Sequence, residues 1–587
     1  MRPTPTLLAT LVSLSATAGA QTNELLSVST AGGQSDAISL YTSMSRDGRY
    51  VTWQSAATNL VPNDTNGAPD VYVRDRVAST TVRVSVDSAG VEGNGNSHDP
   101  VISSDGRLVA FFSYATNFTA NDTNAAPDCF VHDLATGATT LVSATPAGVP
   151  GNGGSRYPAF SGDVRYVAFH SVATDFGPID ANGKRDIYVR DLATGAMELV
   201  SVATDGSQSD GDCSNPVLSH DGRFVVFESF ATNLAPGDTN GTLDIYARDR
   251  LAGITLRVSV STVGAGADGY SQLPNVTADG RFVVFNSEAT NLVAGDTNSF
   301  ADVFVRDLVL GLTERVSVTS AGGQSNGYSY DASISADGRW VAFPSRGINI
   351  VPGDVNGVFD IFLHDRLTGT TEIVTTGFAG DAADGQALYP SISNDGRFIA
   401  YDGASTNLVP GDVNGQRDIF LRDRGAQAEH FFVYCFGDGA ANATPCPCGN
   451  AGGSGRGCAN SVEASGARLA VSGAPSVAND TVVLAAEGMP NSSALYFQGS
   501  LRQSGGIGVA FGDGLRCVGG TIFRLGTKTN ASNASQFPEV GDASVSVRGG
   551  IQAGDVRTYQ VWYRNAAVFC MMSTFNLTNG VQVVWGS

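Results

Sequence analysis

Positive charge is scarce in this chain of 587 residues. Its 35 Lys and Arg residues are outnumbered by 56 Asp and Glu residues, which gives a formal net charge of −21 and a pI of about 4.6. Nucleic acids and anionic lipid surfaces are therefore disfavoured as partners, because like charges repel, whereas cations suit this balance. Only 16% of the residues are charged, and glycine is abundant with 71 residues. This composition favours a β-rich secreted protein with many turns.

Long apolar runs are missing too, apart from one short stretch at the N-terminus. Residues 7–16 are largely apolar, Arg2 precedes them, and Ala18-Gly19-Ala20 fits the small-residue pattern of a cleavage site. The stretch is too short for a membrane span, which needs about 20 residues. We therefore predict a signal peptide over residues 1–20 and a mature protein without a membrane span, secreted or periplasmic.

Recognisable catalytic motifs are absent as well. The sequence contains no Gly-x-Ser-x-Gly, no His-Glu-x-x-His and no glycine-rich phosphate loop. Its six histidines are scattered: His132 and His364 stand where other copies of the repeat described below have arginine, and His170 stands at a variable position. A surface or packing role is the better interpretation of each. No catalytic residue is predicted.

The chain contains seven copies of a repeat of 58 residues, and successive copies follow each other without insertion or deletion. Its first copy reads Ser45-Arg46-Asp47-Gly48-Arg49, and its Asp recurs as Asp47, Asp105, Asp163, Asp221, Asp279, Asp337 and Asp395. A period of this size indicates stacked supersecondary units. Three strands are predicted in the first copy at residues 49–53, 70–74 and 81–86, and residues 101–103 open the next unit. Four antiparallel strands in each of seven units predict a seven-bladed β-propeller over residues 21–430.

The Ser-x-Asp-Gly-Arg-x-Val-x-Phe signature resembles the TolB-type propeller repeat over about residues 24–424. The third copy departs from it, because Val164 stands where the others have Gly. The resemblance implies a fold and a binding-type scaffold, and no particular chemistry. Residues 24–28 match the outer strand of a blade and are expected to complete the last blade; residues 430–433 are the alternative closing strand.

Loop lengths predict which face of the propeller is functional. The first and third turns of each blade are tight, whereas the second loop (56–69 in the first copy) and the link between blades (87–98) are long. Both long connections lie on one face, where function is expected.

The second loop carries Asp-x-Asn-x-x-x-Asp in every copy. The candidate metal ligands are Asp64, Asn66, Asp70, Asp122, Asn124, Asp128, Asp180, Asn182, Asp186, Asp238, Asn240, Asp244, Asp296, Asn298, Asp302, Asp354, Asn356, Asp360, Asp412, Asn414 and Asp418. Ca²⁺ takes six to eight oxygen ligands, which such a loop gathers around one point. The loop resembles the calcium loops of integrin-type propellers and thrombospondin repeats but lacks their central third acid. The alternative is that these residues bond their own backbone as Asx turns.

Variable residues precede each inner strand and are expected to ring the channel mouth on the long-loop face. The candidate ligand-binding residues among them are His98, Asp99, Arg156, Tyr157, Tyr330, Asp331 and Tyr389. A pocket on a symmetric ring must break the symmetry with such residues. Drift at solvated positions is the alternative.

Residues 435–587 lack the repeat and hold six of the eight cysteines. In an exported protein this even number predicts three disulfides, with Cys517–Cys570 the favoured pair, whereas Cys129 and Cys213 are expected to be unpaired. Alternating apolar residues predict an all-β domain with a sandwich or jelly-roll fold. The segment resembles C-terminal regions of secreted bacterial proteins, which suggests sorting, surface attachment or carbohydrate contact.

The sequence thus predicts a secreted, monomeric binding or scaffold propeller for an extracellular protein or carbohydrate, with Ca²⁺ as its candidate cofactor. The alternative is a lyase or hydrolase acting on a polysaccharide at the channel mouth. That reading needs two acid/base groups within reach of one substrate.

Overall fold

The computed structural model describes residues 21–425 except 120, 121, 123, 178 and 179, and, further on, residues 431–434, 446 and, with short gaps, 456–585. The described part forms two compact units, one over Thr22–Asp423 and one within Arg424–Ser587. No helix among these residues is long and apolar enough to cross a membrane.

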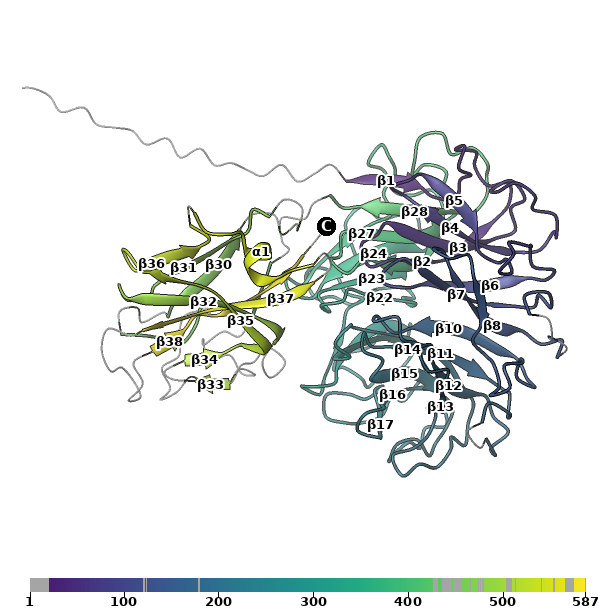
Figure 1. Ribbon diagram of the computed structural model, residues 1–587, viewed down its shortest axis with the longest axis horizontal. Coiled ribbons are helices and arrows are strands. Elements are labelled where there is room, and N and C mark those ends of the chain that lie inside the picture. Colours follow the sequence, from purple (N-terminus) through teal and green to yellow (C-terminus); the bar gives the residue numbers. More distant parts are fainter. Residues whose placement is uncertain are drawn as a thin grey trace, which may run out of the picture. The chain divides into compact units, whose positions relative to one another are not determined.

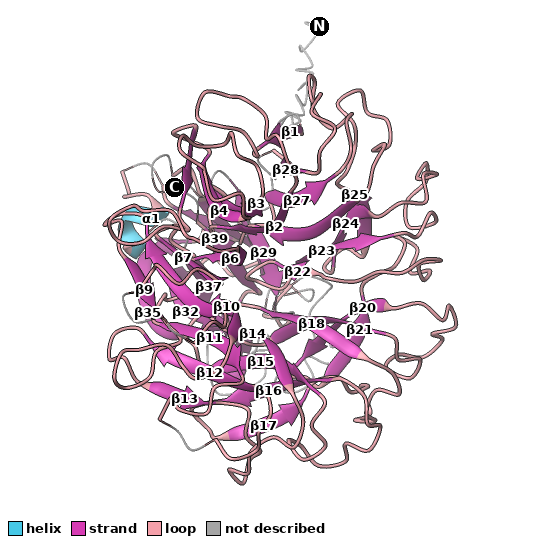
Figure 2. Ribbon diagram, turned by 90° about the vertical axis from the view of Figure 1, so that its right-hand side faces the viewer, coloured by secondary structure: helices cyan, strands magenta, loops and turns pink. Residues whose placement is uncertain are grey.

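The first unit consists of seven four-stranded antiparallel sheets (Figure 1). Each sheet is one copy of the repeat, so the predicted seven-bladed propeller is confirmed. The inner strands of successive blades contact one another, and the last contacts the first, which closes the ring. Figure 2 shows first strands such as β14 and β18 toward the middle of the ring and fourth strands such as β17 and β21 toward its edge.

The first and second strands of the blades have six residues each, except the first strand of the sixth blade, which has two. The first strands are β2 (Ser39–Met44), β6 (Ser97–Ile102), β10 (Ser155–Phe160), β14 (Cys213–Leu218), β18 (Ser271–Val276), β22 (Ser333–Ile334) and β26 (Ala387–Ile392). The second strands are β3 (Tyr50–Ser55), β7 (Leu108–Ser113), β11 (Tyr166–Ser171), β15 (Phe224–Ser229), β19 (Phe282–Ser287), β23 (Trp340–Ser345) and β27 (Phe398–Gly403).

The third strands lead to shorter outer strands. The third strands are β4 (Asp70–Asp75), β8 (Asp128–Asp133), β12 (Asp186–Asp191), β16 (Asp244–Asp249), β20 (Asp302–Asp307), β24 (Asp360–Asp365) and β28 (Asp418–Asp423). The outer strands are β5 (Thr80–Arg83), β9 (Thr139–Leu141), β13 (Met197–Leu199), β17 (Ile254–Arg257), β21 (Leu312–Arg315), β25 (Thr370–Ile373) and, for the last blade, β1 (Thr22–Leu25).

The N-terminal strand completes the last blade, as its repeat-like sequence predicts. β1 pairs antiparallel with β28, with Leu25 opposite Phe420. The alternative closing segment forms β29 (Phe431–Tyr434), which pairs instead with β39 (Gly580–Val584) of the second unit. The segment that precedes the first blade therefore closes the ring through backbone hydrogen bonds to the last blade, and two exposed sheet edges are removed.

The conserved turn residues have structural roles in every blade. In the first, the carboxylate of Asp47 accepts hydrogen bonds from the Ser45 hydroxyl at 2.7 Å and the Arg49 backbone N–H at 3.0 Å. Gly48 supplies the left-handed backbone that this tight turn needs, with φ of 72°. The Arg49 guanidinium then binds Asp75 at the end of the third strand through two hydrogen bonds of 3.0 and 2.7 Å. Motif conservation along the chain thus reflects hairpin geometry.

The hydrophobic core lies between neighbouring blades. One cluster joins Val71 and Val73 of the first blade to Val109 and Phe111 of the second, and all four are almost completely buried. Each such side chain contributes about 1.5–3 kcal/mol when it is fully buried. A blade is therefore stable only between its neighbours, as expected for a repeat architecture.

The second unit is a β-sandwich, as predicted. One sheet has the order β29-β39-β37-β32-β35, with β37 (Val556–Arg564), β32 (Ser493–Arg502) and β35 (Val518–Thr529), and β38 (Phe575–Leu577) pairs with β37. The facing sheet contains β30 (Arg468–Ser472), β31 (Val483–Glu487) and β36 (Ala534–Phe537). Both contribute side chains to one buried cluster. The hairpin β33 (Val509–Phe511) and β34 (Gly514–Arg516) and the short helix α1 (Val545–Gly549) complete the unit.

The disulfides of this unit are described in part. Cys446 and Cys458 form one, with Cα atoms 5.8 Å apart. Cys517 is also disulfide-bonded. The favoured partner, Cys570, lies outside the described residues. Cys129 and Cys213 are buried and unpaired, as predicted.

Candidate functional site

The first strand of each blade begins with an irregular backbone at the long-loop end of the channel. In six blades the pairing with the second strand shifts there, as between Leu40 and Ser43 of β2. In all seven blades one residue at this place has a left-handed φ of 45° to 56°: Tyr41, Asp99, Tyr157, Asn215, Leu273, Asp331 and Tyr389. Residues other than glycine rarely adopt this conformation, and they gather at functional sites. Four of the seven are residues that the sequence singled out.

Side chains from the preceding blade hold this backbone in place. The Asp99 N–H donates to Gln54 Oε1 at 3.0 Å, and the Leu273 N–H donates to Glu228 Oε2 at 2.9 Å. The Tyr41 N–H donates in the same way to Asp402 at 3.2 Å, across the closure of the ring. The second-strand position occupied by Gln54, Glu228 and Asp402 is therefore part of the mouth. Sequence reasoning missed it, although polar residues amid a buried strand were the available signal.

One side of the mouth is acidic. Asp402 is completely buried, and Arg417 donates to its carboxylate at 2.7 Å. Burial, and next the negative charge of Asp402, raise the pKa of Asp331 to about 7. The rings of Tyr389 and Tyr41 lie against each other with centroids 4.4 Å apart. Tyr330 packs its ring against Phe359 at 5.0 Å, so it is held beside this group.

The other side of the mouth is aromatic and carries a cation. Arg156 donates to the Tyr114 hydroxyl at 2.6 Å, and its guanidinium lies over the Phe112 ring. His98 packs its ring on Phe112 with centroids 5.4 Å apart, and burial lowers the pKa of its imidazole. Tyr157 is 41% exposed, and its ring packs against Phe112 and His170 with centroids 5.9 and 5.1 Å apart.

Tyrosines link the two sides. The pKa of Tyr157 is raised by burial and then by the charges of Asp99 and Tyr41. The pKa of Tyr389 is raised by burial and then by the hydroxyl of Tyr41, with a further contribution from Asp331. The mouth thus combines aromatic side chains with the buried carboxyl of Asp402 and the partly buried carboxyls of Asp99 and Asp331. Among the described hydrogen bonds none joins His98 or Asp99 to the carboxyl across the mouth.

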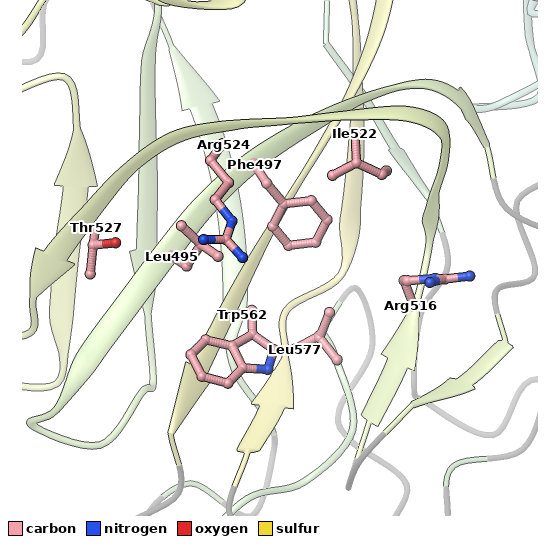
Figure 3. A pocket seen from close by; sticks show the side chains of 8 residues that line it. All are labelled: Leu495, Phe497, Arg516, Ile522, Arg524, Thr527, Trp562 and Leu577. Atoms are coloured by element: carbon pink, nitrogen blue, oxygen red, sulfur yellow. The ribbon is translucent and has the colours of Figure 1, made fainter.

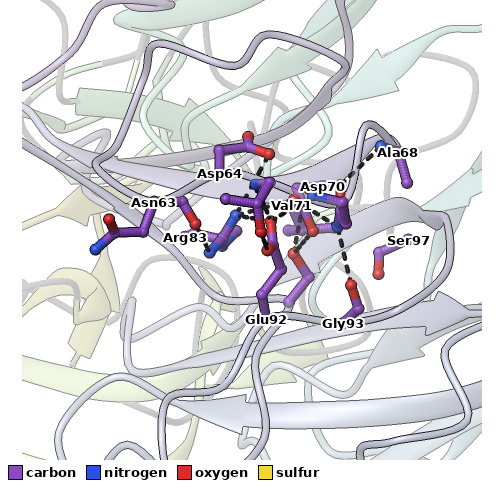
Figure 4. Close-up of polar contacts among 12 residues, drawn as sticks. Asn63, Asp64, Ala68, Asp70, Val71, Arg83, Glu92, Gly93 and Ser97 are labelled. Carbon is purple, nitrogen blue, oxygen red and sulfur yellow. Dashed lines mark hydrogen bonds and ion pairs between the residues drawn. The ribbon is translucent and has the colours of Figure 1, made fainter.

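The second loops are held by their own side chains, as Figure 4 shows for the first blade. Asn66 Oδ1 accepts the Ala68 N–H at 2.7 Å, an Asx turn, and its amide donates to Asp70 at 3.2 Å and to the Gly93 carbonyl at 2.9 Å. Asp70 also accepts the Ser85 hydroxyl at 2.5 Å. The Asn–Asp hydrogen bond and the Asx turn recur in all seven blades. This geometry accounts for the regular repetition of Asn and the second Asp.

The densest group of acids in the described chain already contains a cation. Carboxylate oxygens of Asp64, Asp70 and Glu92 lie within 4.8 Å of one another. The Arg83 guanidinium lies among them, 2.5 Å from Glu92, 3.3 Å from Asp70 and 3.6 Å from Asp64 (Figure 4). Because the guanidinium neutralises these charges, this loop is a poor metal site.

Two cavities lie elsewhere. At the tight-turn end of the propeller channel, about 240 Å³ are lined by residues of all seven blades, among them Arg46, His220 and Asn394. In the second unit, a pocket of about 460 Å³ is lined by Phe497, Trp562 and other residues of the larger sheet, with Arg516 and Arg524 (Figure 3). The sequence predicted neither.

Comparisons with known proteins show only a likeness of fold. No family model and no curated protein matches the sequence. The putative TolB from Agrobacterium tumefaciens is 17% identical, with a TM-score of 0.31 over 48% of this chain and 80% of that chain. An oligogalacturonate lyase in complex with manganese is 14% identical, with a TM-score of 0.41 over 70% and 94%. An acylaminoacyl peptidase from Pyrococcus horikoshii is 11% identical, with a TM-score of 0.40 over 78% and 59%. The sheets themselves establish the propeller.

Proposed function

We propose that this protein is a secreted binding propeller that holds an extracellular carbohydrate at the channel mouth, without acting on it. The observation that supports this is the ring of Tyr41, Tyr157 and Tyr389 beside Asp99 and Asp331 on strained backbone. Sugar rings offer apolar faces for aromatic side chains and hydroxyl groups for carboxylates. Few, convergent polar groups on a preformed apolar surface are typical of ligand sites.

The binding test uses the exposed aromatic ring. Tyr157→Ala should weaken binding of a glycan, identified from an array of extracellular polysaccharides, by about tenfold, which corresponds to ~1.4 kcal/mol. Tyr270→Ala is the matched control, because Tyr270 is 47% exposed and packs on Phe230 much as Tyr157 packs on Phe112, but it is not one of the seven left-handed residues of the mouth. Equal affinity of wild type and Tyr157→Ala would contradict the proposal. Binding of a protein and of no glycan would assign the mouth to a protein partner.

The second candidate is a polysaccharide lyase or hydrolase, supported by the titrating groups of the mouth. Asp331, with a pKa near 7, and His98 would be its acid/base residues. Incubation of the bound polysaccharide with the protein, followed by measurement of new reducing ends and of unsaturated products, separates the two readings. Turnover that is lost in both His98→Ala and Asp331→Ala would replace binding by catalysis.

Calcium is the cofactor of the proposed function. The net charge of −21 and the acidic second loops support it. An ion that binds only the native state raises the melting temperature. Calcium should therefore raise the melting temperature of the wild-type protein, and a chelator should lower it. An identical melting temperature in calcium and in chelator would remove this part of the proposal.

A further inference from the structure

The seven second loops differ in what faces their first Asp. The residue two positions after the second Asp, on the third strand, pairs with a residue on the outer strand. These pairs are Tyr72–Arg83, Phe130–Leu141, Tyr188–Leu199, Tyr246–Arg257, Phe304–Arg315, Phe362–Ile373 and Phe420–Leu25, in blade order. Blades 1, 3, 4 and 5 therefore offer a hydroxyl, a guanidinium or both. Blades 2, 6 and 7 offer neither.

Where a hydroxyl or guanidinium is present, it contacts the first Asp. Asp296 lies 3.2 Å from the Arg315 guanidinium in blade 5. In blade 3, Asp180 accepts the Tyr188 hydroxyl at 3.2 Å. Blade 4 has both partners: the Tyr246 hydroxyl donates to the first Asp, and Arg257 lies 3.5 Å from it. These loops are neutralised or hydrogen-bonded from within.

Blades 6 and 7 leave the first Asp without such a partner. Asp354 is 5% exposed and Asp412 is 9% exposed, and Oδ1 of each is buried without a hydrogen-bond partner. The second acids, Asp360 and Asp418, are completely buried and lie within electrostatic reach of the first. A buried carboxylate oxygen without a partner is costly, so the first Asp of each of these loops requires compensation.

The second acids keep acceptor capacity for an ion. Asp360 accepts the Thr375 hydroxyl at 2.6 Å and the Asn356 amide at 2.8 Å, one on each oxygen. Asp418 accepts three hydrogen bonds: the Ser27 hydroxyl at 2.5 Å and the Ser35 hydroxyl at 2.8 Å on Oδ1, and the Asn414 amide at 2.7 Å on Oδ2. A carboxylate offers about four lone-pair sites, so these hydrogen bonds leave further ones open. They also fix the orientation of the carboxylates before any ion binds.

We propose that two second loops each bind one calcium ion: the loop of blade 6 between Asp354 and Asp360, and the loop of blade 7 between Asp412 and Asp418. In blades 1, 4 and 5 an arginine takes the place of the ion. This rests on the calcium part of the proposed function and specifies its sites. Calcium suits a site of carboxylate and carbonyl oxygens completed by water. Few protein ligands predict weak, extracellular-type affinity, with dissociation constants on the order of 10⁻⁴ to 10⁻³ M.

The exchange of residue pairs between blades tests the proposal in both directions. Phe362→Tyr together with Ile373→Arg gives blade 6 the pair that blade 4 has. This variant should bind one ion fewer than the wild type and should melt higher than the wild type in chelator. The reverse exchange, Tyr246→Phe with Arg257→Leu, should bind one ion more.

The readout is the number of calcium ions bound by the full-length protein, measured by equilibrium dialysis with radioactive calcium. Two ions are expected for the wild type. Seven ions would preserve calcium binding but contradict its replacement by arginine. No bound ion would remove both this proposal and the calcium part of the proposed function, leaving glycan binding at the mouth untouched. An ion count that does not change in either exchange variant would also overturn the proposal.

Discussion

Replacing Leu108 by Phe should destabilise the propeller, and the additional change Val164→Gly should remove that loss. In six blades the residue after the turn Asp is a glycine with φ of 66° to 76°. A Cβ added there would lie 2.3 to 2.5 Å from the large aromatic side chain that opens the second strand of the preceding blade. Only blade 3 has a residue with a Cβ at the glycine position, Val164. Only blade 2, the blade before it, opens its second strand with a non-aromatic residue, Leu108. The two exceptions therefore compensate each other.

The magnitude follows from these contacts. A ring at position 108 would approach Val164 to about the distance forbidden in the other blades, and overpacking of this kind costs about 1–3 kcal/mol. Val164→Gly alone should stay within about 1 kcal/mol of the wild type. It relieves a left-handed β-branched residue with φ of 63°, worth about 1–2 kcal/mol, but adds the backbone entropy of glycine, about 0.5–1 kcal/mol.

A double-mutant cycle measures the compensation. Urea denaturation would give the free energy of unfolding of the wild type, the two single variants and the double variant. All four proteins would be measured at the same concentration of chelator. We expect the double variant to recover most of the loss caused by Leu108→Phe, so that the coupling energy is about 1–3 kcal/mol. Additive effects, with coupling below about 0.5 kcal/mol, would refute the reasoning.

The architecture could be read from the sequence because its signals are local and repeated. The Asp-Gly turn, the alternating strand residues and the spacing of 58 residues fix four strands in each unit, and the closing strand carries the same pattern. The Arg49–Asp75 pair shows why the Arg of the turn motif does not vary. Its two ends, 26 residues apart, bind each other in each blade, so a change at either end breaks a hairpin.

The chemistry of the mouth could be read only in part, because it depends on contacts between blades. The sequence showed Asp99 as a variable residue. It did not show that the Asp99 N–H donates to Gln54, which lies 45 residues earlier in the neighbouring blade, because no motif predicts this contact. The disulfides show the same limit. Six cysteines allow 15 pairings, and spacing does not select Cys446–Cys458 among them.

The roles of the second loops were hidden by their own regularity. A constant Asp-x-Asn pattern suggested seven equal sites, whereas the decisive residues lie at the cross-strand pair that faces the loop. That pair is visible in the sequence as Tyr72 and Arg83, but only the register of third and outer strands shows that the two side chains reach the same carboxylates. Sequence motifs predict which atoms a loop offers, and the surrounding sheet determines what those atoms bind.

Two further predictions concern charged groups. Asp365→Asn should lower the free energy of unfolding by about 3–5 kcal/mol, because Arg339 and Asp365 are 4% and 3% exposed and the buried guanidinium would lose the carboxylate charge that faces it. Asp133→Asn, whose partner Arg107 is 56% exposed, should cost much less, and equal losses in urea denaturation would contradict this. Asp331 should make the protein less stable as the pH rises from about 4 to 7, because its pKa is about 7 in the native state and about 3.9 in the unfolded chain. The native state then binds more protons than the unfolded state across this window, so the contribution is fully present below pH 4 and lost as the pH passes 7. Asp331→Asn should flatten that part of the stability profile, and a slope equal to that of the wild type would show that this carboxyl ionises in the folded protein as it does in water.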